Sequence, residues 1–294
     1  MTSVGTLRDS SRQATDGFDL GTGDRFRLTT RRLLSSATPY LGLAGIVLLL
    51  VFWYLTTEFF SLPRFQKLPG PVAVWTEFTS RNPTFGTSLF SPDYYKHILW
   101  SSWRVLQAFF WATILGVPLG LLMGWQRKIR DYTFPVIELL RPIPVLAWVP
   151  LAILMIPGRE APIIFLAFLA AFFATTLNTL LGVASIDESY FRAARCLGSK
   201  PRHIFRRIVL LGAMPYIFTG LQISVGVAWF SLVAAEMVSG EHGLGFLIWD
   251  SYVLVQYPVI IIAMATLGIV GYLYSAIIRL VGRMLMRWTA RTGD

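Results

Sequence analysis

Six long apolar stretches dominate this chain of 294 residues and limit what it can fold into. They cover approximately residues 40–60, 98–125, 133–156, 162–184, 208–238 and 259–285. About 20 apolar residues suffice for an α-helix to cross a bilayer. Only 14% of the residues are charged, against roughly a quarter in an ordinary soluble domain, so the chain lacks the polar surface of a water-soluble globule. We therefore predict an all-α membrane protein with six transmembrane helices.

Lys and Arg residues are unevenly divided between the two sides of these spans. With a cytoplasmic N-terminus, 19 of the 26 Lys and Arg residues lie on the inner side and five on the outer side. The inner segments are 1–39, 126–131, 185–207 and 279–294, and the outer segments are 61–97, 157–161 and 239–258. Because cytoplasmic loops collect Lys and Arg, we predict that both termini are cytoplasmic. The net charge of +10 then reflects topology, and membrane lipid rather than nucleic acid is the expected partner.

Polar segments flank the apolar region. We predict an N-terminal tail over 1–39, a transmembrane domain over 40–288 and a C-terminal tail over 289–294. The segment 240–258 is apolar but too short for a seventh span, so we expect an interfacial or re-entrant helix there. The single cysteine excludes a disulfide framework, and the three histidines lack metal-ligand spacing. We expect neither a metal site nor a catalytic residue.

Small residues recur at helical spacing in two of the spans. The two sets are Gly116, Gly120 and Gly124, and Gly220, Ser224 and Ala228. Such stripes let helix backbones approach closely in lipid, where the hydrophobic effect gives no drive for helix association. We predict tight helix packing along both.

The loop between the fourth and fifth spans, residues 187–207, carries the signals of two short helices. Asp187 is a good N-cap residue, and Glu188 in the first turn is favoured by the helix dipole. Gly198 is the residue type that most readily takes the left-handed conformation that ends a helix. Pro201 then favours the start of a second helix, which runs into the next span.

Three apolar side chains in this loop, Phe191, Ala194 and Leu197, fall on one face of the first helix. Two interpretations of the loop remain open from its residues alone. It is either a basic loop that fixes the topology or a rigid surface helix that a partner recognises.

The pattern Ala193-Ala194-x-x-x-Gly198, followed after nine residues by Ile208-x-Leu210, resembles the EAA loop of the membrane permeases of bacterial binding-protein-dependent ABC importers. Arg192 stands where that pattern usually has Glu, and Leu211 where it usually has Pro. The resemblance implies the six-helix, MetI-like fold of type I importers. It also implies that the first helix of the loop docks on a separate ATPase subunit. The coupling residues would be Asp187, Glu188, Phe191, Arg192, Ala193, Ala194, Leu197, Gly198 and Pro201.

Further motifs resemble the nitrate, sulfonate, taurine and bicarbonate branch of that family, and are closest to the nitrate and bicarbonate permeases. These motifs are the Pro-Gly-Pro at 69–71, the proline-rich segment 140–150 and the run 235–250, and the similarity covers about residues 65–288. The branch implies import of a small anion, such as nitrate, nitrite or bicarbonate, with a sulfonate or taurine as further options.

The same resemblance implies the partners and the location. We expect two ATPase subunits that hold ATP and Mg²⁺, a second permease copy and a periplasmic or lipid-anchored substrate-binding protein, all at the bacterial inner membrane. The chain has no G-x-x-x-x-G-K-[ST] loop, so ATP hydrolysis is expected on another polypeptide, and we expect no cofactor on this one.

Ionisable residues at membrane depth are candidates for the translocation pathway, because a charge there costs about 2.5–3.5 kcal/mol on insertion scales. The candidates, together with one aromatic that would narrow the path, are Arg104, Glu138, Arg141, Trp148 and Glu236. Each has a structural alternative. Glu138 and Arg141, three residues apart, can pair with each other. Arg104 and Glu236 can form an interhelical ion pair without touching a solute, and Trp148 can serve in packing.

Two other classes of protein fit this sequence less well. A stand-alone secondary anion transporter is the main alternative, but the two halves of the chain show no convincing inverted repeat of broken helices. An intramembrane enzyme would need a nucleophile and a base, or paired acids, at membrane depth. Cys196 and the histidines fall outside the predicted spans.

Overall fold

The computed structural model of the chain describes residues 37–59 and 68–286. The regular elements in these two ranges are all helices, which confirms the all-α prediction. Most of the predicted tail 1–39, and all of the tail 289–294, lie outside the described residues. The chain divides into two compact units, residues 1–66 and residues 67–294, which are considered separately.

The first unit contains helix α2 (Ala37–Tyr54) and a π-helical turn, η1 (Leu55–Phe59). Its apolar window Tyr40–Phe59 matches the predicted span 40–60. The hydroxyl of Thr56 donates to the Phe52 carbonyl (2.9 Å), and that of Thr57 to the Trp53 carbonyl (2.8 Å). Local hydrogen bonds therefore satisfy both threonine hydroxyls at the end of a largely apolar helix.

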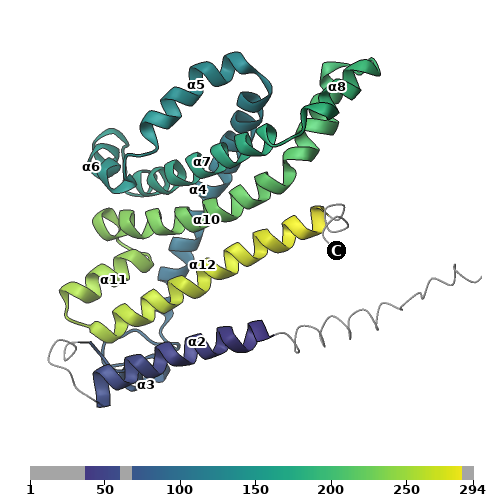
Figure 1. Cartoon of the computed structure of the whole chain (residues 1–294). Coiled ribbons are helices and arrows are strands. Elements are labelled where there is room, and N and C mark those ends of the chain that lie inside the picture. Colours follow the sequence, from purple (N-terminus) through teal and green to yellow (C-terminus); the bar gives the residue numbers. More distant parts are fainter. Residues whose placement is uncertain (1–36, 60–67, 287–294) are drawn as a thin grey trace, which may run out of the picture. The chain divides into compact units, whose positions relative to one another are not determined.

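The second unit holds the remaining helices, most of which are labelled in Figure 1. They are α3 (Pro71–Thr79), α4 (Pro92–Trp125), α5 (Arg127–Leu140), α6 (Val145–Met155), α7 (Glu160–Ala184), α8 (Glu188–Cys196), α9 (Pro201–Ile204), the π-helical turn η2 (Phe205–Val209), α10 (Leu210–Ser239), α11 (Leu244–Val253) and α12 (Tyr257–Leu285).

Five helices of the described ranges are long and apolar enough to cross a membrane, and a sixth span results if α5 and α6 are counted together. The predicted stretches 98–125, 162–184 and 259–285 lie within α4, α7 and α12. The predicted stretch 208–238 lies within a longer helical run, because α9, η2 and α10 continue into one another from Pro201 to Val238, as the helix start expected at Pro201 indicated.

The predicted span 133–156 is not one continuous helix. It corresponds to α5 and α6, which are bent by 100° at the four residues Arg141–Pro144. Pro142 and Pro144 lack the backbone N–H that would continue the helical hydrogen bonds, so the chain turns at this point.

Helix α7 packs extensively against both α4 and α10, and these contacts build the main core. Fully buried residues from the three helices meet there, among them Val105, Leu166 and Leu232. Helix α6 contributes two further buried residues to this core, Val149 and Ala152.

The close packing predicted for the first small-residue stripe is confirmed at the contact between α4 and α7. A Cβ atom added at Gly120 would lie 2.6 Å from the Cβ of Thr179, and one at Gly124 would lie 2.4 Å from the Cβ of Val183. Both distances are too short for any side chain. Glycine is therefore required for α4 and α7 to approach this closely.

The second stripe lies on α10 and contacts the other side of α7. A Cβ atom at Gly220 would lie 2.5 Å from the Cβ of Asn178, and the Ser224 hydroxyl donates to the Ala171 carbonyl at 3.0 Å. This prediction too is confirmed. Helix α7 is thus held between two helices that each present small residues to it.

Candidate functional site

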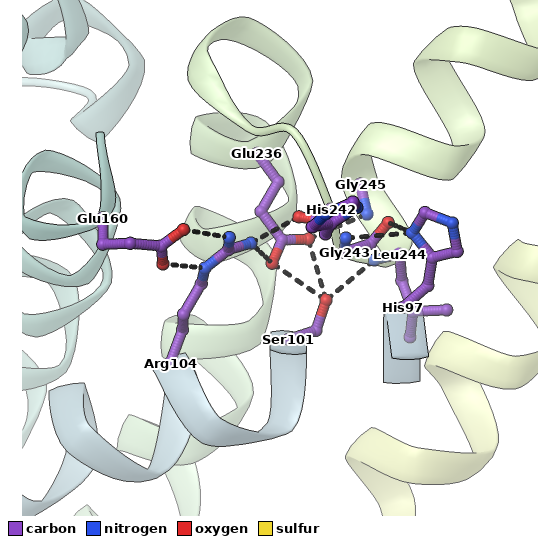
Figure 2. Close-up of polar contacts among 9 residues, drawn as sticks. All are labelled: His97, Ser101, Arg104, Glu160, Glu236, His242, Gly243, Leu244 and Gly245. Carbon is purple, nitrogen blue, oxygen red and sulfur yellow. Dashed lines mark hydrogen bonds and ion pairs between the residues drawn. The ribbon is translucent and has the colours of Figure 1, made fainter. Parts of the chain in front are cut away.

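An ion cluster with a buried centre joins four helices in the second unit. At its centre is Arg104 of α4, whose side chain is 1% exposed. Its guanidinium makes a two-pronged contact with Glu160 at the start of α7, with Nε 2.6 Å and Nη2 2.7 Å from the two carboxylate oxygens. Its Nη1 lies 2.8 Å from Oε1 of Glu236, near the end of α10 (Figure 2). One guanidinium thus connects α4, α7 and α10.

Glu236 is fully buried and holds the segment that leads into α11. Its Oε2 accepts a hydrogen bond from the Gly245 N–H (2.9 Å) and, like Oε1, lies 2.9 Å from the Ser101 hydroxyl. The Ser101 oxygen in turn accepts from the Leu244 N–H at 2.8 Å. The first backbone N–H groups of α11 are therefore satisfied by α4 and α10, as Figure 2 shows.

The chain before α11 fits against the cluster because two glycines lack side chains. Gly243 has a φ of 126°, and a Cβ atom there would lie 2.4 Å from the Glu236 carboxylate. A Cβ atom at Gly245 would lie 2.4 Å from the Val233 carbonyl oxygen. Nδ1 of His97 lies 3.0 Å from the Gly243 nitrogen and 3.1 Å from the Gly243 carbonyl oxygen, so it accepts from the N–H or donates to the carbonyl, depending on the tautomer of the imidazole.

Arg104 and Glu236 form the interhelical ion pair that was one of the two roles expected for them from the sequence. Glu160 falls in a segment that the sequence predicts as an outer loop, and neither Ser101 nor His97 was predicted as a site residue. A signal was available for Ser101 and His97, since both lie on the Arg104 face of α4, at three and seven residues before it. Glu160 is 56 residues away along the chain, and only the packing of α4 on α7 brings it close.

The bend between α5 and α6 carries the other two predicted ionisable residues. Nη2 of Arg141 lies 3.0 Å from Oε1 of Glu138, so these residues pair with each other, and their side chains are 48% and 45% exposed. Trp148 of α6 packs partly buried against the main core, and its buried indole Nε1 has no hydrogen-bond partner among the described residues. The pair at the bend is therefore accessible, whereas Arg104 and Glu236 are closed off and only the Glu160 side of their cluster is exposed, at 48%.

The loop between α7 and α10 forms the helix–glycine–helix predicted for it. Oδ1 of Asp187 accepts a hydrogen bond from the Ser189 N–H at 2.7 Å and so caps α8, and this backbone hydrogen bond lowers the pKa of Asp187. At the other end, Gly198 has a φ of 70°. The N–H of Ser199 donates to the Ala194 carbonyl and that of Gly198 to the Arg195 carbonyl, which is a Schellman cap.

Aromatic packing anchors one side of α8 to the helix bundle. The Phe191 ring lies 6.4 Å from that of Trp125 at the end of α4, and Trp125 lies 5.7 Å from Phe205 in η2. Phe191 and Ala194 are partly buried, but Leu197, expected on the same face, is 85% exposed. Because Leu197 follows the last residue of α8, it extends past the surface on which Phe191 packs.

Most of the other residues predicted for coupling lie on the free surface of this loop. The exposed ones are Asp187, Glu188, Arg192, Ala193, Gly198 and Pro201. The structure thus presents a short helix, capped at both ends, with one anchored and one free side.

Comparison with known proteins identifies the family. Residues 116–291 match the family model of the binding-protein-dependent transport system inner membrane component, which is more than half of the chain. The chain belongs to this family. It is therefore a multi-pass membrane permease component of an ABC importer, and the prediction made from the loop motif is confirmed.

Individual relatives support the predicted branch of this permease. The chain is 35% identical over 252 residues to the bicarbonate transport system permease protein CmpB of Synechococcus elongatus, covering 84% of this chain and 89% of that protein. It is 33% identical over 242 residues to the taurine transport system permease protein TauC of Escherichia coli, covering 82% and 86%.

A solved structure supports the fold of the permease. The chain resembles a protein chain in an inward-facing structure of the MetNI methionine ABC transporter with a TM-score of 0.56 and 20% identity, covering 66% of this chain and 94% of that one. The MetI-like fold is thereby confirmed.

Proposed function

We propose that this permease forms the translocation pathway for a small anion and couples it to ATP hydrolysis on two separate ATPase subunits. The observation that carries the coupling proposal is α8, a helix that is capped at both ends, has one exposed side and is followed directly by the exposed Leu197. The similarity to permeases for bicarbonate and taurine supports an anionic solute, with bicarbonate, nitrate or nitrite favoured and taurine or a sulfonate as further options.

Helix α8 has the mechanical properties that coupling requires. The Asp187 cap and the Schellman cap at Gly198 keep it helical at both ends, so a force on its free side moves it as a unit. Phe191 passes that movement to Trp125 of α4 and, through it, to Phe205 at the start of the α10 span. Two spans that flank α7 are thereby driven from one docking point.

Different roles follow for the charged residues at membrane depth. We propose that Glu138, Arg141 and Trp148 contribute to the pathway, since the pair at the bend is accessible and the indole Nε1 has no partner among the described residues. Arg104 and Glu236 are enclosed, so they act on the pathway by holding α11 in place rather than by binding the solute.

The proposal includes the expected assembly and orientation. A second copy of the permease completes the pathway, ATP and Mg²⁺ are held by the ATPase subunits, and a periplasmic or lipid-anchored binding protein delivers the anion. Both termini lie in the cytoplasm, because the Lys and Arg distribution favours that orientation.

The coupling proposal is tested by the substitution Leu197→Ser in the full chain, expressed together with its ATPase subunit. Because Leu197 is 85% exposed, we expect normal membrane insertion but reduced co-purification of the ATPase subunit and loss of ATP-driven uptake into vesicles. Leu154→Ser is the matched control, since Leu154 of α6 is 83% exposed and does not belong to the loop.

Gly198→Val provides a second test, since a β-branched residue is strained at a φ of 70° and will distort the end of α8. Equal ATPase retention in both loop variants and the control would refute docking at α8. Uptake by the wild-type chain without nucleotide or ATPase subunit would instead indicate a secondary transporter.

A further inference from the structure

A groove between α5 and α7 lies at the same end of the bundle as α8. It encloses about 510 Å³ and is lined by two charged residues, Arg130 and Asp131, and by apolar ones that include Phe134, Leu181 and Ala184. That volume falls within the roughly 300–1,000 Å³ of sites that bind small molecules. Leu181 is 58% exposed, so an apolar surface is open directly beside an exposed Arg.

The first turn of α5 concentrates positive charge next to this groove. Arg127, Lys128 and Arg130 are all exposed and occupy the N-terminal end of the helix, where the helix dipole is also positive. The cap residue Gln126 makes no side-chain hydrogen bond to the free N–H groups of that turn. Cations are normally favoured at the C-terminal end of a helix, whereas here they add to the positive dipole of the N-terminal end. This turn therefore attracts an anion.

The chain itself neutralises little of that charge. Within the described part of the chain, Arg127 pairs with Asp131 across 3.9 Å, and both side chains are largely exposed. The carbonyls at the end of α7 are already occupied, since Ser185 donates to those of Leu181 and Gly182, and Ile186 to that of Val183. The groove therefore combines a net positive end with an apolar floor.

We infer that this groove binds one phospholipid of net negative charge, such as phosphatidylglycerol, from the leaflet in which the α5 end lies. Arg130 binds the phosphate, the Asp131 carboxylate accepts hydrogen bonds from headgroup hydroxyls, and the proximal acyl chain lies on Phe134 and Leu181. Basic grooves between transmembrane helices are suited to anionic headgroups on the cytoplasmic side. That side is the one proposed here for α5, while binding itself does not depend on ATPase coupling.

The test is native mass spectrometry of the full chain, purified in mild detergent from membranes that contain phosphatidylethanolamine and phosphatidylglycerol. We expect the wild-type chain to retain phosphatidylglycerol above its proportion in the membrane. Arg130→Gln removes the phosphate partner and should lower that retention about fivefold, the effect of one cation at a membrane surface. Arg283→Gln is the matched control, since Arg283 is an exposed cation in the last turn of α12.

A second variant addresses the apolar part of the groove. Leu181→Trp fills the acyl-chain surface and leaves Arg130 in place, so it should also release the lipid, whereas Leu285→Trp at the end of α12 should not. Retention of the two lipids in their membrane proportion would overturn the inference. So would an equal loss in Arg130→Gln and Arg283→Gln, or phosphatidylglycerol retention that Arg130→Gln leaves unchanged.

Discussion

Arg104 and Trp125 lie on the same helix, about 30 Å apart along α4, yet the regions that they organise differ in where their partners lie. Around Arg104, charged and backbone groups of α4, α7, α10 and α11 satisfy one another inside the chain. Around Trp125, the rings of Phe191 and Phe205 pack against the bundle, while Leu197 at the end of α8 stays exposed.

The comparison separates residues that hold the bundle from residues available to another protein. A buried charge without its partner is strongly destabilising, so the Arg104 cluster is sensitive to every member. An exposed apolar side chain such as Leu197 contributes little to the stability of the isolated chain, and its contribution appears in an assembly. Substitutions at the two regions should therefore change different measured properties.

The largest expected effect is that of Arg104→Met, which sharpens this contrast. Glu236 would remain buried without its cation, at a cost of about 3–5 kcal/mol. We expect the midpoint of thermal unfolding in detergent to fall by about 10 °C, given the 2–4 °C per kcal/mol typical of chains of this size. Fluorescence-detected gel filtration after heating measures this midpoint.

Two variants serve as controls for that prediction. Lys96→Gln removes from the same helix an exposed cation whose Nζ lies 2.7 Å from Oδ1 of Asp93. Because exposed ion pairs contribute little to stability, this variant should leave the midpoint unchanged. The double variant with Arg104→Met and Glu236→Gln removes the unpaired charge and should recover part of the loss. A midpoint in Arg104→Met equal to that in Lys96→Gln would contradict the role assigned to the cluster.

A somewhat smaller effect is expected for Gly243→Ala, which probes the backbone beside the cluster. An alanine at a φ of 126° is strained, and its Cβ atom would meet the Glu236 carboxylate at 2.4 Å. We expect a loss of about 2–3 kcal/mol, since backbone strain alone costs about 1–3 kcal/mol. The same unfolding measurement checks this. Gly226→Ala is the matched control, because a Cβ atom there meets nothing within 4 Å and alanine is the better helix former.

A local effect on α8, rather than a loss of global stability, is expected for Phe191→Ala, which tests the anchoring of α8. Loss of the half-buried ring and its contact with Trp125 should weaken docking of α8 by about 1–2 kcal/mol. Global unfolding should barely change, while amide hydrogen exchange of α8 speeds up by at least about fivefold, the equivalent of 1 kcal/mol. Tyr190→Ala, at a neighbouring position that is 63% exposed, should have a smaller effect on that exchange. A large drop in the global midpoint for Phe191→Ala would erase the distinction between the two regions.

The sequence predicts the parts of this structure that depend on local composition. The spans follow from length and hydropathy, and Asp187 and Gly198 mark the ends of α8 because capping depends on neighbouring backbone groups. The bend of 100° was not predicted, since Pro142 and Pro144 indicate a break in a helix but not its angle.

Contacts between distant segments account for most of what the sequence missed. Glu160 follows Arg159 at the edge of a span, so its polar neighbours suggested a loop, and nothing local indicates that its carboxylate reaches Arg104. The exposure of Leu197 was also missed, because helical spacing places it with Phe191 but does not say where the underlying surface ends.

The smallest expected effect is the pH dependence of α8, which the Asp187 cap makes testable. The Ser189 N–H lowers the pKa of Asp187 in the folded state, so the cap is fully formed at neutral pH and is lost as the pH falls through that lowered pKa, below about 4. Exchange of the first α8 amides, corrected for the intrinsic pH dependence of amide exchange, should therefore speed up only in this acidic range. In Asp187→Asn, the side-chain oxygen still accepts the hydrogen bond but does not titrate, so this acid-dependent change should disappear. An identical acid response in Asp187→Asn would mean that a group other than Asp187 controls this end of α8. The Asp187 cap would then not be what keeps α8 helical at its start.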